Sequence, residues 1–185
     1  MSSPFRILCL GNEVLADDAF GWVAAEELRR RFPQMDVVFT TESGFQLLDY
    51  LCDIQFLLVV DSIQTGSVPP GTLYVLRSSD IKTPFGTSPH YVGLLETIQL
   101  AKQLQHNFPE NVIILAVEVV DCLTLGGDML PAVKSTAGLV ADLVGEFAQT
   151  WQPVSEGADR SCSQGLQKAI ASVAARWGSE RIAVI

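Results

Sequence analysis

Residues 8–21 of the chain are Leu-Cys-Leu-Gly-Asn-Glu-Val-Leu-Ala-Asp-Asp-Ala-Phe-Gly. A short apolar run ends at a Gly-Asn turn, and two adjacent carboxylates, Asp17 and Asp18, precede a segment with apolar side chains every three or four residues. This pattern predicts a strand over 5–10, then a loop, then a helix that begins at or near the aspartates and ends near Phe32. One aspartate at a helix N-terminus is ordinarily a cap. A helix needs only one such cap, so two adjacent aspartates are harder to explain as caps alone.

Strand and helix patterns alternate along the rest of the chain. Further strands are predicted over 36–41, 55–61, 72–77 and 111–118. Helices are predicted over 45–51, from His90 to about 104, and from about 131 to 151. The connection before 72–77 is short and contains no helix, which favours an antiparallel strand there. The alternation predicts an α/β protein, a three-layer α/β/α sandwich around a mostly parallel twisted sheet.

Length and composition favour one main domain. With 185 residues, of which 48% are hydrophobic and 18% charged, the chain is long enough for one well-filled core and short for two. We expect an α/β/α domain over 1–152 and a tail over 153–185. The tail begins with a linker over 153–163, rich in Ser, Gly and charge, and ends in an amphipathic helix over 166–177 that packs on the domain.

The net charge of −9 excludes some classes of partner. Residues 151–185 hold four basic and three acidic side chains, so the first 150 residues carry the negative charge. An acidic body repels phosphates, and we therefore expect no nucleic-acid partner. No apolar run is long enough to span a membrane, and no secretory signal is visible at the N-terminus. The four cysteines are scattered without a Cys-x-x-Cys pair, which favours reduced thiols in a cytoplasmic protein.

Polar side chains follow the predicted parallel strands at their carboxyl ends, where open sheets bind ligands. The loop with Asn12 and Asp18 follows the first strand, the turn with Gly44 follows the second, and Asp61 ends the third. His90, one of two histidines, opens a helix. Two carboxylates and one imidazole suit a borderline divalent ion such as nickel or zinc. We therefore take Asp18, Asp61 and His90 as candidate metal-contacting residues.

The ordered set of motifs closely resembles the hydrogenase maturation protease family, whose members trim the C-terminal extension from the large subunit of nickel-iron hydrogenases. The likeness covers roughly residues 5–150. The matching pieces are Gly11-Asn12, Asp17-Asp18, Gly21, Asp61-Ser62, Pro69, Gly71-Thr72, Ser88-Pro89-His90, Gly93-Leu94 and Leu130-Pro131-Ala132-Val133. Each piece is weak alone, and the ordered set with matching spacing is specific.

The resemblance implies a phosphorylase/hydrolase-like fold and an endopeptidase that processes the nickel-loaded precursor of a [NiFe] hydrogenase large subunit. It implies that Asp18, Asp61 and His90 are the catalytic set and contact nickel, which belongs to the substrate; zinc or cadmium could occupy the same site. Whether the metal is a catalyst or a recognition anchor stays open. Asn12 and Gly44 are candidate substrate-binding residues by their place in the loops. The loop over 40–44 departs from the family, because relatives are often Gly-rich there.

Other classes of function remain as alternatives. A non-catalytic metal- or partner-binding module would use the same three residues, and only turnover separates it from a protease. A peptidyl-tRNA hydrolase-like enzyme shares a related architecture but needs a basic groove, and a nucleotide-binding module would need Gly-x-Gly-x-x-Gly or a Lys-bearing phosphate loop, which is absent. Under the protease hypothesis, His90→Ala or Asp18→Asn should abolish processing and spare the fold, because neither residue is predicted in the core.

Overall fold

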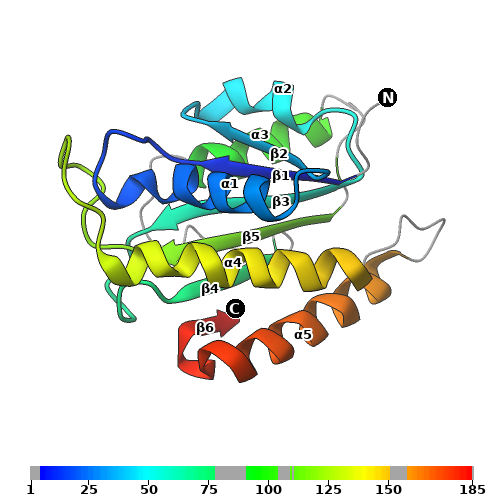
Figure 1. The fold of residues 1–185 in the computed structure, drawn as a ribbon. Helices are drawn as coiled ribbons and strands as arrows, with labels where there is room; N and C mark the ends of the chain where they lie inside the picture. Colours follow the sequence, from blue (N-terminus) through cyan, green and yellow to red (C-terminus); the bar gives the residue numbers. More distant parts are fainter. Residues whose placement is uncertain (1–4, 78–90, 104–108, 110, 151–157, 185) are drawn as a thin grey trace.

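The computed structural model of the chain describes residues 5–77, 91–103, 109, 111–150 and 158–184. Its centre is a six-stranded sheet in the order β2-β1-β3-β5-β4-β6 (Figure 1). The strands are β1 (Phe5–Leu10), β2 (Asp36–Thr40), β3 (Phe56–Ile63), β4 (Leu73–Arg77), β5 (Asn111–Glu118) and β6 (Ile182–Val184). The pairs β2–β1, β1–β3 and β3–β5 are parallel, and β4 runs antiparallel to β5. These findings confirm the mostly parallel sheet and its antiparallel strand.

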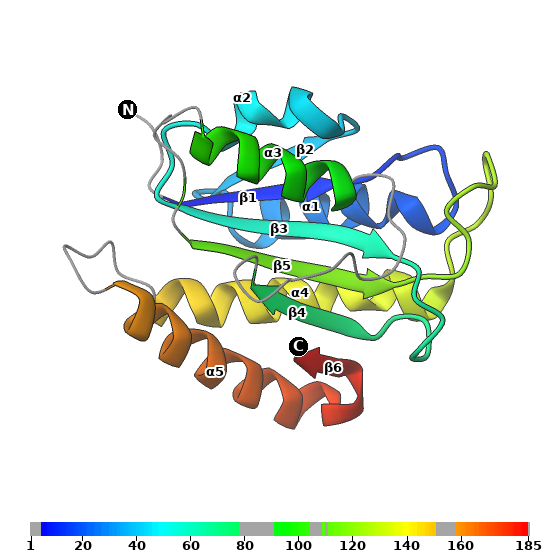
Figure 2. The same cartoon turned by 180° about the vertical axis from the view of Figure 1, so that it is seen from behind.

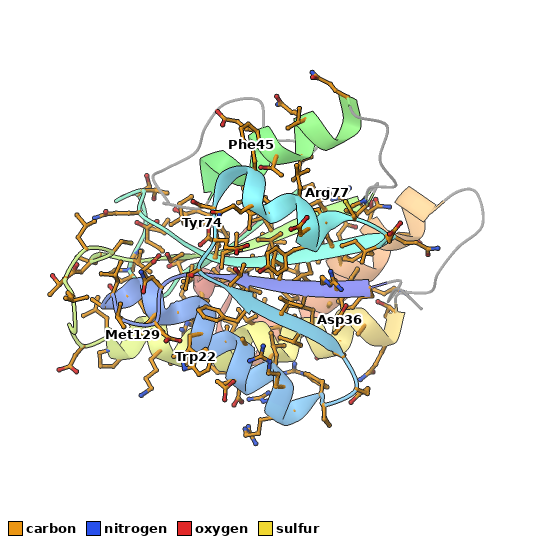
Figure 3. All side chains as sticks on the ribbon, turned by 90° about the horizontal axis from the view of Figure 1, so that it is seen from above. Trp22, Asp36, Phe45, Tyr74, Arg77 and Met129 are labelled. Atoms are coloured by element: carbon orange, nitrogen blue, oxygen red, sulfur yellow. The ribbon has the colours of Figure 1, made fainter. Side chains whose placement is uncertain are left out.

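Helices cover both faces of the sheet, as Figures 1 and 2 show from opposite sides. They are α1 (Phe20–Arg31), α2 (Leu48–Leu51), α3 (Tyr91–Gln103), α4 (Pro131–Thr150) and α5 (Ala158–Trp177), with short 3-10 helices η1 (Asp17–Ala19), η2 (Gly44–Leu47) and η3 (Ser179–Arg181). One layer contains α1, α4 and α5, and the other contains η2, α2 and α3. Figure 3 shows Trp22 of α1 and Phe45 of η2 on opposite sides of the sheet. The three-layer sandwich is therefore confirmed.

Strand β3 explains why the sheet lies in the middle of the molecule. All eight of its residues are buried. Phe56, Leu58 and Val60 join the core under α1 and α4, whereas Leu57 and Val59 join the core under α2 and α3. Successive side chains of a strand point to opposite faces, so a continuous apolar run needs cover on both sides. Among the described helices, none combines the length and hydropathy needed to cross a bilayer.

Strand β3 is longer than predicted. The sequence pattern placed its end at Asp61, but the strand continues to Ile63, and the backbone of Asp61 and Ser62 pairs with Ala116 and Val117 of β5. The prediction was wrong because it took the change from apolar to polar side chains as the end of the strand. Backbone pairing with a neighbouring strand does not depend on side-chain polarity. Asp61 is consequently held inside a rigid strand.

The C-terminal tail also differs from its prediction. Helix α5 begins at Ala158, within the segment 153–163 that was predicted as a linker, and residues 151–157 lie outside the described part. The polar N-terminal turns of α5 carry no apolar signal, so the pattern detected the helix only from Leu166 onward. Val173 is fully buried in the same core as α4, which confirms that the helix packs on the body. After η3 the chain adds β6 to β4, a strand too short for an alternation pattern to reveal.

Candidate functional site

Two loops meet at the carboxyl edge of the parallel strands, and both views show them side by side (Figures 1 and 2). Loop A (residues 11–16) follows β1, and loop B (residues 119–130) follows β5. Leu15 and Leu125 form an isolated antiparallel bridge between them. Further backbone hydrogen bonds run from Ala16 N to Thr124 O (3.0 Å), from Gly126 N to Val14 O (2.8 Å) and from Asp17 N to Asp121 O (2.8 Å). The two loops therefore form one hydrogen-bonded unit.

Asp17 joins this unit through its side chain. Its carboxylate is 1% exposed and accepts three backbone N–H bonds from loop B. Oδ1 accepts from Leu130 N at 2.8 Å, and Oδ2 accepts from Val120 N and Asp121 N, both at 3.1 Å. The start of its own helix has no side-chain cap. Asp17 is thus an anchor for a loop more than 100 residues away, and not the helix cap that the sequence suggested.

Ser62 forms a hydrogen bond with each of the carboxylates of Asp18 and Asp61. Asp18 is 0% exposed, and Ser62 Oγ donates a 2.7 Å hydrogen bond to its Oδ1. The backbone N–H of Ser62 donates a 2.8 Å bond to Asp61 Oδ1. A charge-assisted bond of this kind fixes the orientation of a carboxylate. Ser62 thereby positions both predicted carboxylates, although the sequence singled it out only as a neighbour of Asp61.

The burial of Asp18 corrects one expectation. The sequence pattern predicted this residue outside the core, yet its side chain is completely buried. The cause is the tight turn before it, in which Asn12 N donates to Asp18 O and Asn12 Oδ1 accepts from Val14 N. A Cβ at Gly11, where φ is +153°, would collide with the Asp18 carbonyl oxygen. The turn at Gly11 and Asn12 therefore directs the loop toward the sheet and places Asp18 at the sheet edge.

Asp61 is 1% exposed and has the strand parity of Leu57 and Val59, whose core lies under α2 and α3. Helix α3 begins at Tyr91, directly after His90. His90 and the preceding Ser-Pro lie outside the described residues, so the third member of the predicted set is not placed. Within the described part of the chain, no three His, Cys, Asp or Glu side chains are arranged to hold one metal ion.

Gly44 lies against α3 through its backbone. Gly93 approaches so closely that a Cβ on it would come within 2.7 Å of Gly44 N, and Thr97 Oγ1 donates a 2.8 Å bond to Gly44 O. Gly44 itself has φ +59°, a left-handed conformation that favours glycine. The structure thus gives Gly44 a packing role beside the first turn of α3. Its predicted role in substrate binding stays a prediction, as does that of Asn12.

Cys122 lies next to the candidate site, although its sequence position alone did not single it out. It is buried in loop B. Burial raises the pKa of its thiol to about 12; the charges of Asp18, Asp17 and Asp61 act in the same direction, against a hydrogen bond with Ser62 that lowers it. Its position just after the strand 111–118, next to the strand that carries Asp61, was the signal available in the sequence.

Glu118, the last residue of β5, is a second acid at this edge with a structural role. It is 2% exposed, and its Oε1 accepts the backbone N–H groups of Thr65 and Gly66 at 2.9 and 2.7 Å. Its Oε2 accepts the Thr65 hydroxyl at 2.6 Å. These bonds fold the connection from β3 toward β4. Glu118 is therefore occupied by the loop beside the site.

We predict that Cys122 resists alkylation in the folded protein. A thiol with a pKa of about 12 holds very little thiolate at pH 8, so iodoacetamide should label Cys122 roughly a thousandfold more slowly than in urea, where the pKa is about 8.5. Peptide mapping by mass spectrometry measures both rates, with the partly exposed Cys52 as internal control. Because the pKa is higher in the folded state, stability from the neutral thiol is complete below pH 8.5 and is lost as pH rises toward 12. Equal labelling in both states would contradict the burial.

Sequence comparisons identify proteins of hydrogenase maturation as relatives of this chain. A family model described as hydrogenase maturation protease matches residues 23–146, a range that contains Asp61 and begins after Asp18. The hydrogenase expression/formation protein HupD of Bradyrhizobium diazoefficiens is 30% identical over 151 residues, which are 78% of each chain. The hydrogenase 2 maturation protease of Escherichia coli is 28% identical over 116 residues, 60% of this chain and 70% of that one.

Solved structures share the fold. The hydrogenase maturating endopeptidase HybD from E. coli superposes with a TM-score of 0.61 and 19% identity, over 94% of this chain and 93% of that chain. The [NiFe] hydrogenase maturation protease HybD from Thermococcus kodakarensis gives a TM-score of 0.64 at 19% identity, over 78% of this chain and 98% of that chain. The architecture of the molecule is therefore that of known maturation proteases.

Proposed function

The chain belongs to the hydrogenase maturation protease family, and on that premise we propose that it removes the C-terminal extension from the nickel-loaded precursor of a [NiFe] hydrogenase large subunit. It is a hydrolase of peptide bonds by its family, and the precursor is its proposed partner. We place this reaction in the cytoplasm. The nickel enters as part of the substrate, so the protein needs only side chains that contact it during processing.

The observation that carries the proposal is that two buried carboxylates, Asp18 and Asp61, each accept a hydrogen bond from Ser62. Asp18 and Asp61 lie at the carboxyl edge of the sheet, with one oxygen of each held by Ser62. Carboxylate oxygens, together with the imidazole of His90, suit a borderline divalent ion such as nickel, and zinc or cadmium would also fit. Fixing one oxygen leaves the orientation of each carboxylate defined before the substrate arrives.

These residues would then recognise the inserted metal and align the scissile bond. Carboxylates attract a divalent cation, so a precursor that carries nickel would be favoured over one that lacks it. Bound between the two proteins, the metal would polarise the scissile carbonyl or a water molecule. Asp18 and Asp61 would hold the complex in register, and the rigid strand β3 would keep Asp61 from moving.

Intact-mass spectrometry of large-subunit precursors tests the proposal. Each candidate precursor, with and without nickel, is incubated with the unmodified protein, with His90→Ala and with His106→Ala, the matched control at the other histidine. We expect loss of a C-terminal peptide only from the nickel-loaded form, and only with the unmodified protein and the control. Cleavage of the nickel-free precursor would support the protease assignment and contradict the nickel requirement. No cleavage of any candidate would favour a non-catalytic binding module.

A further inference from the structure

Loops A and B carry a cluster of exposed apolar side chains. In the described part of the chain, eight large apolar side chains are exposed, and five of them belong to these loops. They are Val14 (50%), Val120 (53%), Leu123 (84%), Leu125 (76%) and Leu130 (38%). Single exposed apolar residues are ordinary on any surface. A group of them on two adjoining loops is a feature of interaction sites.

The scaffold beneath this cluster is ordered. The Leu15–Leu125 bridge joins the loops, and Asp17 holds loop B at both ends. Asp121 Oδ1 accepts the N–H groups of Leu123 and Thr124 at 3.0 and 2.9 Å, which forms the turn that presents Leu123. A surface that is already fixed loses little conformational entropy when a partner binds. The apolar side chains are therefore displayed by a preformed structure.

The charges around the cluster define its partner. Glu13, Asp121 and Asp128 flank the apolar side chains, and residues 11–22 and 118–133 contain no Lys or Arg. A second copy of this chain would bring the same carboxylates against them, and an anionic membrane surface would be repelled in the same way. The cluster suits a protein segment with apolar side chains flanked by Lys or Arg.

The same two loops hold the candidate site. Loop A leads directly into Asp18, and loop B carries Cys122, whose thiol lies against Ser62. We infer that loops A and B form the docking surface for the large-subunit precursor, which binds them through an apolar segment flanked by basic residues. Docking there places the precursor beside the turn that carries Asp18. The inference rests on the proposed function, since it names where that substrate is held.

A double variant, Leu123→Ser with Leu125→Ser, tests the docking surface. Both side chains are exposed, so the fold should persist, and the urea unfolding midpoint checks this. We expect the Kd for the purified precursor and the KM of processing to rise about tenfold or more, with kcat within about twofold of the unmodified protein. Val184→Ser, at 64% exposure on β6, is the matched control and should leave both constants unchanged.

A second double variant, Glu13→Lys with Asp128→Lys, tests the charges. It should weaken binding of the precursor and make that binding less dependent on ionic strength. If the unmodified protein cleaves the precursor and the double leucine variant keeps its Kd and KM, the docking surface is wrong and the proposed function stands. If no precursor is cleaved, the proposed function fails, and Kd alone decides the docking surface. A concentration-dependent dimer that the leucine variant abolishes would assign the surface to self-association and overturn the inference.

Discussion

Asp18→Asn and Asp61→Asn, each made alone, should lower the rate of precursor processing by at least about 100-fold while the protein stays folded. Asparagine has nearly the shape of aspartate, so Oδ1 of residue 18 can still accept the 2.7 Å bond from Ser62 and the core is not opened. The negative charge is lost, and with it the attraction for a metal-bearing substrate. A neutral amide in a buried position also costs less to desolvate than a carboxylate.

The choice of asparagine matters because Asp18 is fully buried. An alanine there would leave a void and remove the acceptor of the Ser62 hydroxyl, and lost activity would then report a damaged fold. Ser62→Ala is the informative companion, since it keeps both charges and removes the hydroxyl that bonds Asp18 and Cys122. We expect it to slow processing about tenfold. The rate of extension loss by mass spectrometry, read beside the thermal midpoint, measures all three variants. Normal processing by both asparagine variants would contradict the assignment of the carboxylates.

Asp17→Ala should lower the free energy of unfolding by about 3–5 kcal/mol, because three backbone N–H groups lose a charged acceptor at once. Those amides are only partly buried, so water replaces some of the loss and keeps the value below the sum of three full penalties. Asp17→Asn should cost about half as much, since one carbonyl oxygen remains. Urea unfolding followed by circular dichroism gives the free energies.

Asp128→Ala is the matched control for Asp17, because it removes an exposed acid from the same loop and should change stability by less than about 0.5 kcal/mol. If the free energy of unfolding of Asp17→Ala differs from that of the unmodified protein by less than this margin, Asp17 does not anchor loop B. The contrast between neighbours is informative: Asp17 variants should lose stability, whereas Asp18→Asn should lose activity.

The sequence was sufficient for elements that are long and strongly patterned. The apolar runs at β3 and β5 predicted a buried parallel sheet, and the short connection before β4 predicted its antiparallel direction. Strand β6 and the first turns of α5 escaped prediction because one is three residues long and the other is polar. Asp18 and Asp61 could be selected because strand ends cluster at one edge of a parallel sheet.

The individual contacts in the site could not be predicted in the same way. Asp17 and Asp18 are identical residues in adjacent positions, yet one holds loop B and the other meets Ser62, which lies 44 residues along the chain. Which of them faces β3 depends on how Gly11 and Asn12 turn the chain. That turn involves a single positive φ and three local hydrogen bonds of Asn12, which leave no periodic pattern.

The contact between Gly44 and Gly93 has a consequence for sequence variation among relatives. Two backbones meet there without room for a side chain, so the two positions are constrained as a pair: a larger residue at 93 would drive α3 away from η2. The side chains at 41–43 take no part in this contact. Substitutions at 93 should therefore be rarer in evolution than substitutions at 41–43.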